Sequence, residues 1–263
     1  MDRARPALTL SQWSMRTPIA MVGLLLAAPT LGLAQSAQQR EAAKTEVWKP
    51  VPAVVATPEH AAPSDATVLF DGKGLDAWES ESGGKAPWSV ADGVLTVLPG
   101  SKGIRTKKNF CDLQLHVEWR SPADTNGVSG QNRGNSGIFL QDRYELQVLD
   151  SHDNPTYANG QAASIYKQAI PAVNASRPPG VWQSYDVIWK APRFSEGGGL
   201  RSPARITVLH NGVLVQDDTV LAGKTEYIGA PSYSAHGCAP IALQDHDSKV
   251  SFRNIWVREL PSR

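Results

Sequence analysis

Short runs of alternating apolar and polar residues recur along this chain of 263 residues, with turn signals between them. In the run at 112–120, the residues at every second position share apolar character: Leu113, Leu115, Val117 and Trp119. Such alternation is typical of a strand with one buried face. The Asp-Gly pair at 92–93 and the Asn-Gly pair at 211–212 favour tight hairpins, because these residues tolerate positive φ. Extended helical periodicity occurs only near the N-terminus, so the sequence predicts an all-β sandwich or barrel.

The first 34 residues read as an export signal. Arginines precede an apolar run at 19–33, and a small-x-Ala site ends at Ala34. Gly23 and Pro29 interrupt this run, which is too short to span a bilayer comfortably. We expect cleavage, a periplasmic or secreted protein and no stable membrane anchor afterwards; an uncleaved anchor is the alternative. Residues 35–64 predict an extended Pro/Ala-rich leader, and residues 65–263 a single β-sandwich domain.

Charge and cysteine content narrow the possible partners. Removal of residues 1–34 would change the formal net charge from +1 to about −1, without the concentrated positive surface that nucleic-acid binding needs. We therefore expect no nucleic-acid partner.

Cys111 and Cys238 could pair in an oxidising compartment, or could be two buried thiols, and the sequence leaves this open.

No motif calls for a cofactor, and we expect none to be required. Neither cysteine has the spacing of a zinc site, and no phosphate-binding glycine loop is present in the sequence. Asp150, His152 and Asp153 could hold a divalent cation such as calcium through oxygen ligands. A solvated loop is the favoured interpretation of this cluster, and no metal ligand is assigned.

Two predicted strands carry polar side chains of functional type on one face. Glu145 and Gln147 alternate with apolar residues in the run at 144–148, and His116 and Glu118 do so at 112–120. A carboxylate and an amide aligned on an open sheet face suggest sugar recognition. The alternative is the solvated outer face that antiparallel sheets often have.

Several ordered motifs lie between about Asp65 and Leu260: LFDGKGLDAW, WSVADGVLTV, LHVEWR, RGNSGIFLQDRYELQVLD, SIYKQ, WQSYDVIW, HNGVLVQD, PIALQDH and FRNIWVREL. With these motifs the chain resembles the 3-keto-disaccharide hydrolase family. The resemblance implies a concanavalin A-like jelly-roll sandwich of two antiparallel sheets. It also implies an enzyme, a hydrolase or lyase, that acts on 3-keto-glycosides or related sugars, with a carbohydrate substrate as its partner.

A ketone at C3 of a sugar opens a route to glycosidic cleavage. The ketone acidifies the hydrogen at C2, so that a base can remove it and the substituent at C1 can be eliminated. Such a site needs a base near C2, donors for the enolate oxygen at C3 and an acid for the leaving oxygen. Addition of water to the resulting enone would complete a net hydrolysis.

The polar faces and the resemblance together give the candidate site. We expect His246 and Glu118 to be base and acid, Glu145 to be a second carboxylate in the same groove, and Arg133 to stabilise the oxyanion. Two carboxylates facing one groove would raise each other's pKa. The residues expected to bind substrate are His116, Asn135, Gln147, Tyr166, Gln244 and, as a stacking platform, Trp182. His210, next to the hairpin turn, is expected at the surface.

Two other classes remain open at this stage. A non-catalytic carbohydrate-binding module, or lectin, would use the same groove without turnover, but it would more plausibly show few titratable groups. A conventional retaining glycosidase needs two carboxyl groups about 5 Å apart. On this fold such enzymes usually carry them as E-x-D-x-E on one strand, whereas Glu118 has no acidic neighbour of that kind.

Overall fold

The computed structural model describes residues 36–261, so the predicted export signal lies outside the described residues. A short helix, α1 (Ala37–Ala43), begins after Ser36. The Ser36 hydroxyl accepts a hydrogen bond from the Gln39 amide at 3.1 Å, and the Gln39 side chain accepts one from the Ser36 amide at 2.7 Å. This capping box explains why part of the predicted extended leader is helical. No helix in the described part of the chain is long and apolar enough to cross a membrane.

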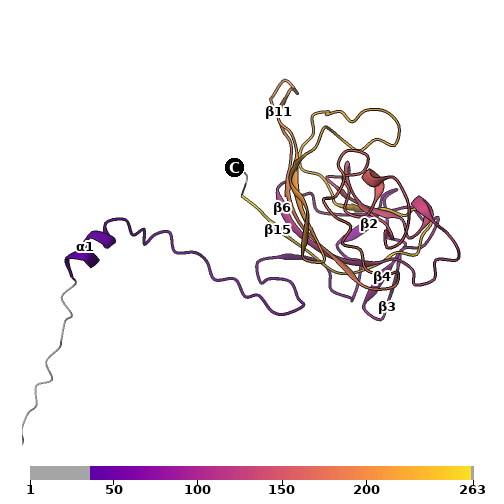
Figure 1. Cartoon of the computed structure of the whole chain (residues 1–263), viewed down its shortest axis with the longest axis horizontal. Coiled ribbons are helices and arrows are strands. Elements are labelled where there is room, and N and C mark those ends of the chain that lie inside the picture. Colours follow the sequence, from indigo (N-terminus) through magenta and orange to yellow (C-terminus); the bar gives the residue numbers. More distant parts are fainter. Residues whose placement is uncertain (1–35, 262–263) are drawn as a thin grey trace, which may run out of the picture. The chain divides into compact units, whose positions relative to one another are not determined.

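The described part of the chain divides into two units, residues 36–53 and residues 54–261. The second unit is a sandwich of two antiparallel sheets, which confirms the predicted all-β fold (Figure 1). The larger, eight-stranded sheet has the order β13-β12-β9-β6-β15-β4-β3, with β1 also paired to β15. The smaller, five-stranded sheet has the order β2-β5-β14-β7-β8. Figure 1 shows β2 of the smaller sheet on the inner side of the curve formed by the larger one.

The strands have the following bounds. The larger sheet contains β1 (Thr67–Phe70), β3 (Ser89–Ala91), β4 (Val94–Thr96), β6 (Leu113–Arg120), β9 (Gln183–Lys190), β12 (Arg205–His210), β13 (Val213–Val220) and β15 (Ser251–Glu259). The smaller sheet contains β2 (Trp78–Ser80), β5 (Ile104–Thr106), β7 (Ser136–Leu140), β8 (Tyr144–Val148) and β14 (Ala242–Leu243). A separate hairpin consists of β10 (Arg193–Phe194) and β11 (Leu200–Ser202), and single 3₁₀ turns occupy Gly130–Asn132 and Ala158–Gly160.

The core lies between the two sheets, where the apolar faces of their strands meet. On β6 burial alternates strictly, with the predicted apolar residues inside. From β8 the side chains of Tyr144, Leu146 and Val148 enter the same core. The rings of Tyr144 and Trp189 lie 5.1 Å apart, and the Tyr185 hydroxyl donates to the Gln147 carbonyl at 2.9 Å, which joins the two sheets. The polar side chains that alternate with these residues therefore leave the sandwich through two different outer faces.

His210 is buried rather than at the surface, so that expectation was wrong. It is the last residue of β12 and continues the inward series of Ile206 and Val208. Its ring packs against Trp119 and Tyr185, with centroids 5.9 and 4.9 Å away. Burial lowers the pKa of His210 to about 4.

The two cysteines form a disulfide between Cys111 and Cys238, with Cα atoms 4.6 Å apart. The bond joins the residues just before β6 to the segment that leads into β14, 127 positions later. The predicted Asp-Gly and Asn-Gly turns are also present, connecting β3 to β4 and β12 to β13 with positive φ at both residues of each pair.

Candidate functional site

The outer face of the smaller sheet carries a row of side chains in register across all five of its strands. From one edge to the other the row is Glu79, Arg105, Ala242, Phe139 and Glu145. Glu79 and Arg105 form an ion pair at 2.8 Å. A neighbouring row includes Gln244, whose backbone amide donates to the Gly137 carbonyl at 2.9 Å, and Gln147, which is opposite Gly137 on the adjacent strand.

Glu145 is the carboxylate of this face without a counter-charge. Its side chain is 5% exposed. Among residues 36–261 its carboxyl oxygens have no hydrogen-bond or ion-pair partner, although its backbone amide donates to the Thr225 hydroxyl at 2.9 Å. Burial raises the pKa of Glu145 to about 8, because removal from water disfavours the charged form. A carboxyl group whose pKa lies near neutral pH can accept or donate a proton during a reaction.

Gly137 leaves open the space beside this carboxylate. A Cβ atom at Gly137 would lie 2.8 Å from Oε1 of Glu145 and 2.9 Å from Cε2 of Phe139. Both distances are shorter than side chains tolerate, so any larger residue would displace one of these neighbours. Gly137, the second residue of β7, therefore keeps the acid unobstructed, and the absence of a side chain at this strand position leaves the carboxylate in place.

The segment that follows β8 folds back over this face. Gln147 donates to Gln131 at 3.1 Å and to the Gly160 carbonyl at 3.3 Å. Tyr166 donates its backbone amide to the Glu145 carbonyl at 3.2 Å, and its hydroxyl lies 2.7 Å from that of Tyr157. Burial raises the pKa of Tyr166, with further contributions from Tyr157 and from the charge of Glu145. Tyr166 therefore remains a neutral hydrogen-bond donor next to the acid.

Three amide oxygens of the smaller sheet and its adjoining loops are buried without a donor in the described part of the chain. They belong to Asn135, Gln147 and Gln244. Leaving a buried acceptor unpaired costs about 1–3 kcal/mol, and such groups call for a specific explanation. Two of the three, on Gln147 and Gln244, belong to the row next to Glu145 on the outer face.

The structure thus brings Glu145 together with three of the residues predicted to bind substrate, Gln147, Tyr166 and Gln244. Asn135, just before β7, instead donates its side-chain amide to the Gln131 carbonyl at 2.7 Å. Arg133 has a different environment. Its guanidinium group lies 3.0 Å from the Asp150 carboxylate and donates to the His152 carbonyl, so it braces this loop. The predicted oxyanion role for Arg133 has no support in these contacts.

His246 is exposed in the loop after β14, two positions beyond Gln244. Its neighbour Asp245 accepts hydrogen bonds from the backbone amides of Lys102 and Asp247, each at 3.0 Å. These bonds hold the loop in place, but none of them involves the His246 ring. Its role as a base remains a prediction.

Glu118 does not share a groove with Glu145, and that expectation was wrong. Glu118 leaves the outer face of the larger sheet, where it lies 2.6 Å from Arg253 and accepts a hydrogen bond from Asn254 at 2.9 Å. Although burial opposes the change, these two partners lower the pKa of Glu118. His116 lies beside it and pairs with Asp186 at 2.7 Å. The alternation on each strand was predicted correctly, but the two strands belong to different sheets.

Trp182 belongs to the Glu118 side as well. The guanidinium groups of Arg120 and Arg253 lie 4.6 and 4.2 Å from its ring centroid. These contacts occupy the aromatic surface that was expected to stack on a sugar, and they place Trp182 away from Glu145. A cavity of about 570 Å³ borders this cluster, lined in part by Glu118, Arg253 and Trp256.

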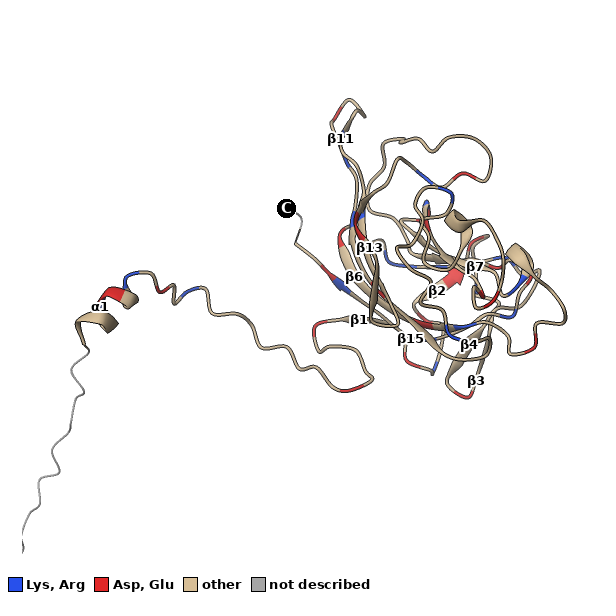
Figure 2. Cartoon of the chain, viewed as in Figure 1, with Lys and Arg blue, Asp and Glu red and all other residues tan. Residues whose placement is uncertain are grey.

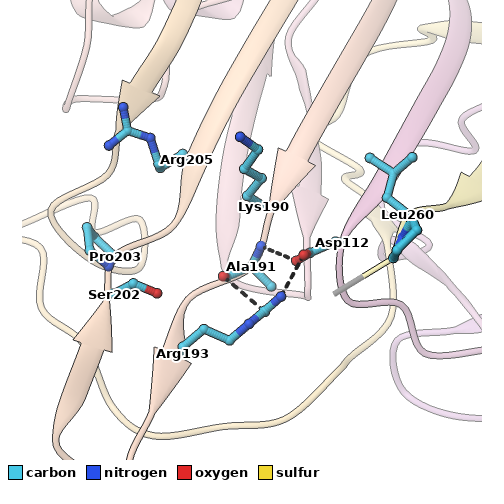
Figure 3. A pocket seen from close by; sticks show the side chains of 9 residues that line it. Asp112, Lys190, Ala191, Arg193, Ser202, Pro203, Arg205 and Leu260 are labelled. Atoms are coloured by element: carbon cyan, nitrogen blue, oxygen red, sulfur yellow. Dashed lines mark hydrogen bonds and ion pairs between the residues drawn. The ribbon is translucent and has the colours of Figure 1, made fainter. Parts of the chain in front are cut away.

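A further pocket of about 380 Å³ lies where β9, β12 and the β10–β11 hairpin meet (Figure 3). Figure 3 shows Lys190 and Arg205 at its wall and Arg193 bound to Asp112, a contact of 2.6 Å. No residue of the predicted site lines this pocket. Across the sandwich as a whole, acidic and basic residues are interspersed (Figure 2).

A metal centre has no candidate in the described chain: residues 36–261 contain no group of three or more His, Cys, Asp or Glu side chains arranged to hold an ion. Asp150, considered above as a calcium ligand, is paired with Arg133. The expectation that the reaction requires no cofactor stays a prediction.

Sequence reasoning missed three contributors to the site, Phe139, Gly137 and Thr225. Phe139 sits on the outward side of β7, which the alternation of that strand could have indicated. Gly137 has no side chain, and nothing in the local sequence marks it as a neighbour of the Glu145 carboxylate. Thr225 comes from a loop 80 positions after Glu145, and no local sequence signal connects the two.

An unpaired, buried acid beside amide side chains on the outer face of an antiparallel β-sandwich suits an enzyme that acts on a polar substrate such as a sugar. The comparison with known families agrees: the chain belongs to the family of the 3-keto-alpha-glucoside-1,2-lyase-like domain, which matches residues 65–258. It is therefore an enzyme of the 3-keto-disaccharide hydrolase and 3-keto-alpha-glucoside-1,2-lyase type, as the resemblance predicted.

Individual relatives support this assignment. A 3-keto-disaccharide hydrolase of Bacteroides thetaiotaomicron is 26% identical over 239 residues, covering 73% of this chain and 77% of the relative. A crystal structure of a "putative glycosyl hydrolase" from Parabacteroides distasonis is 52% identical, with a TM-score of 0.78 over 83% of this chain and 96% of that one. A second structure of that description from the same organism, 23% identical with a TM-score of 0.55, covers 75% of this chain and 94% of that one and shares the fold.

Proposed function

We propose that this protein is an exported enzyme that cleaves 3-keto-glycosides at the outer face of the smaller sheet, by removal of the C2 proton and elimination at C1. The observation that carries the proposal is the isolation of Glu145. Its carboxyl group is buried, has no cationic partner among the described residues and has a pKa raised to about 8. An acid that is kept unpaired at the cost of stability is better explained by chemistry than by folding.

Glu145 acts as the base in this proposal. The C2 proton passes to its carboxylate, the electron pair of the C–H bond forms the C1–C2 double bond, and the C1–O bond breaks with its pair on the leaving oxygen. Solvent then protonates that oxygen. A raised pKa favours this role, because a less solvated carboxylate is a stronger base.

Tyr166 supplies the hydrogen bond that the developing charge requires. The C3 ketone gains negative charge as the C2 proton leaves, so a neutral donor fixed next to Glu145 would stabilise the enolate oxygen. The contact between the hydroxyl groups of Tyr157 and Tyr166, at 2.7 Å, allows Tyr157 to donate to Tyr166 while Tyr166 donates to substrate. In this proposal Gln244 binds a sugar hydroxyl group, whereas Gln147, 1% exposed and bonded to Gln131 and Gly160, supports the loop beside the site.

The product of elimination is an enone, and water addition to it gives net hydrolysis. One first step therefore accounts for both the lyase and the hydrolase descriptions among the relatives. A conventional retaining mechanism would need a second carboxylate about 5 Å from the first. Glu118, the candidate for that role, leaves the opposite face of the sandwich.

The export part of the proposal is supported by two features. The first 34 residues have the charge and hydrophobic pattern of a cleaved signal. The disulfide between Cys111 and Cys238 is of the kind that persists in oxidising compartments such as the periplasm.

The test compares a chromogenic glucoside with its 3-keto counterpart, using the wild-type protein and Glu145→Gln. We expect release of the chromophore from the keto form alone, and loss of that release in the variant. Deuterium at C2 should slow the wild-type reaction. Release from the ordinary glucoside at the same rate would contradict elimination, and binding without release from either substrate would favour a lectin.

A further inference from the structure

A cluster of three tyrosines surrounds one lysine at the edge of the Glu145 face. The ammonium group of Lys167 lies 4.2 Å from the ring centroid of Tyr227, 5.7 Å from that of Tyr166 and 5.9 Å from that of Tyr157. Lys167 also donates to the Tyr227 carbonyl at 2.7 Å. These four residues, called here the tyrosine cluster, hold two loops together that are 60 positions apart in the sequence.

Both loops are attached to the residue proposed as the base. Tyr166 donates its backbone amide to the Glu145 carbonyl, and Thr225, two positions before Tyr227, accepts from the Glu145 amide. Glu145 lies at the end of its row, on the edge strand β8. The two loops therefore extend the outer face of the smaller sheet beyond that edge. The tyrosine cluster is thus the wall next to the reacting position.

The outer members of the cluster are open to solvent. Tyr227 is 71% exposed and Tyr157 is 40% exposed, and Ile228 beside them is 83% exposed. Exposed apolar side chains that adjoin one another beside polar residues are a feature of ligand-binding surfaces. Tyrosine rings suit a ligand ring with an apolar face, and the ordered Lys167 limits the entropy that binding would cost.

We propose that Tyr157 and Tyr227 form the subsite for the leaving group, and that this group carries a ring with an apolar face. The inference rests on the proposed function and deepens it. The keto-sugar must lie over the Glu145 carboxylate to lose its C2 proton, and the group attached at C1 then extends toward the neighbouring wall. Either a second pyranose or a non-sugar ring provides the required surface.

The experiment uses three 3-keto-glucosides of one anomer whose leaving groups are methanol, cyclohexanol and glucose. Methanol and cyclohexanol are alcohols of similar acidity, so a difference in their rates reports binding rather than chemistry. We expect the wild-type protein to prefer the substrates with a ring. Tyr227→Ala should lower kcat/KM for these about tenfold, as the loss of about 1.4 kcal/mol of ring stacking predicts, and should leave the methyl substrate unchanged.

Tyr227→Phe is the matched control, because it keeps the ring and should keep the preference. A larger effect of Tyr227→Ala on the glucose substrate than on the cyclohexanol substrate would identify the subsite as one for a second sugar, and the reverse as one for a non-sugar ring, because each ratio of wild-type to variant cancels the acidity of the leaving alcohol. Equal effects of Tyr227→Ala on all three substrates, or none, would overturn the inference while the proposed function stands. A wild-type protein that cleaves none of the three would refute both.

Discussion

A Cβ atom at Gly137 would lie 2.8 Å from Oε1 of Glu145. Gly137→Ala should therefore displace the carboxylate. A displacement of about 1 Å in a catalytic group lowers kcat/KM about 100-fold. The free energy of unfolding should change little, because the atom that must move is the end of a side chain. Turnover of a 3-keto-glycoside and urea unfolding measure the two effects.

Gly197→Ala is the control for this substitution, since a Cβ atom there meets no other atom within 4 Å. It should leave turnover unchanged. Full activity in Gly137→Ala would show that the position of the Glu145 carboxylate is not critical.

The same acid should make stability depend on pH. The pKa of Glu145 is raised in the folded protein from 4.5 to about 8, so the folded state binds more protons than the unfolded state between these values. Stability should therefore fall as pH rises through this range, by about 1.4 kcal/mol per unit from this group. Urea unfolding of the wild-type protein and Glu145→Gln measures it: the variant should be the more stable protein at about pH 8. If the free energies of unfolding of the two proteins changed with pH in parallel, the raised pKa of Glu145 would be contradicted.

Glu118 should matter to stability and not to turnover. Glu118→Gln removes the charge that faces Arg253, an ion pair whose arginine is half exposed, and such pairs contribute up to about 1 kcal/mol. Because the folded-state pKa of Glu118 is lowered, this contribution is present above its ordinary value of 4.5 and is lost as pH falls below it. Turnover of Glu118→Gln at the wild-type rate is the expected result, and a folded but inactive variant would return Glu118 to the mechanism.

The disulfide should stabilise the sandwich by restricting the unfolded chain. Closing a loop of 127 positions contributes up to about 5 kcal/mol in the chain-entropy model. The double variant Cys111→Ser, Cys238→Ser should unfold at a lower urea concentration, and the wild-type protein should shift to the same value when reduced. A reductant should leave the double variant unaffected. An unchanged midpoint on reduction would show that the bond does not constrain the unfolded state.

The fold was predictable because its signals are local. Alternation on β6 and β8 and the two hairpin turns depend on neighbouring residues, and each was correct. His210 was misplaced because its proximity to a turn was given more weight than the inward series that begins at Ile206.

The site was predictable only in part, because it depends on which strands pair. The sequence showed polar faces on both strands, but it gave no information on whether Glu118 and Glu145 belong to one sheet. Gln147, on the same strand, and Tyr166, whose backbone amide binds the Glu145 carbonyl, lie near Glu145, and their role in binding substrate stays a prediction. Thr225 and the partners of Glu118 on β15 come from distant segments, and only the three-dimensional pairing reveals them.

The dependence of kcat/KM on pH for a 3-keto-glycoside tests the central claim, that Glu145 removes the C2 proton, most directly. The ionised form is the active one in this account, so kcat/KM should rise with pH and reach a plateau above a midpoint near the Glu145 pKa of about 8. A profile that is flat through this range, or that falls with rising pH, would contradict it.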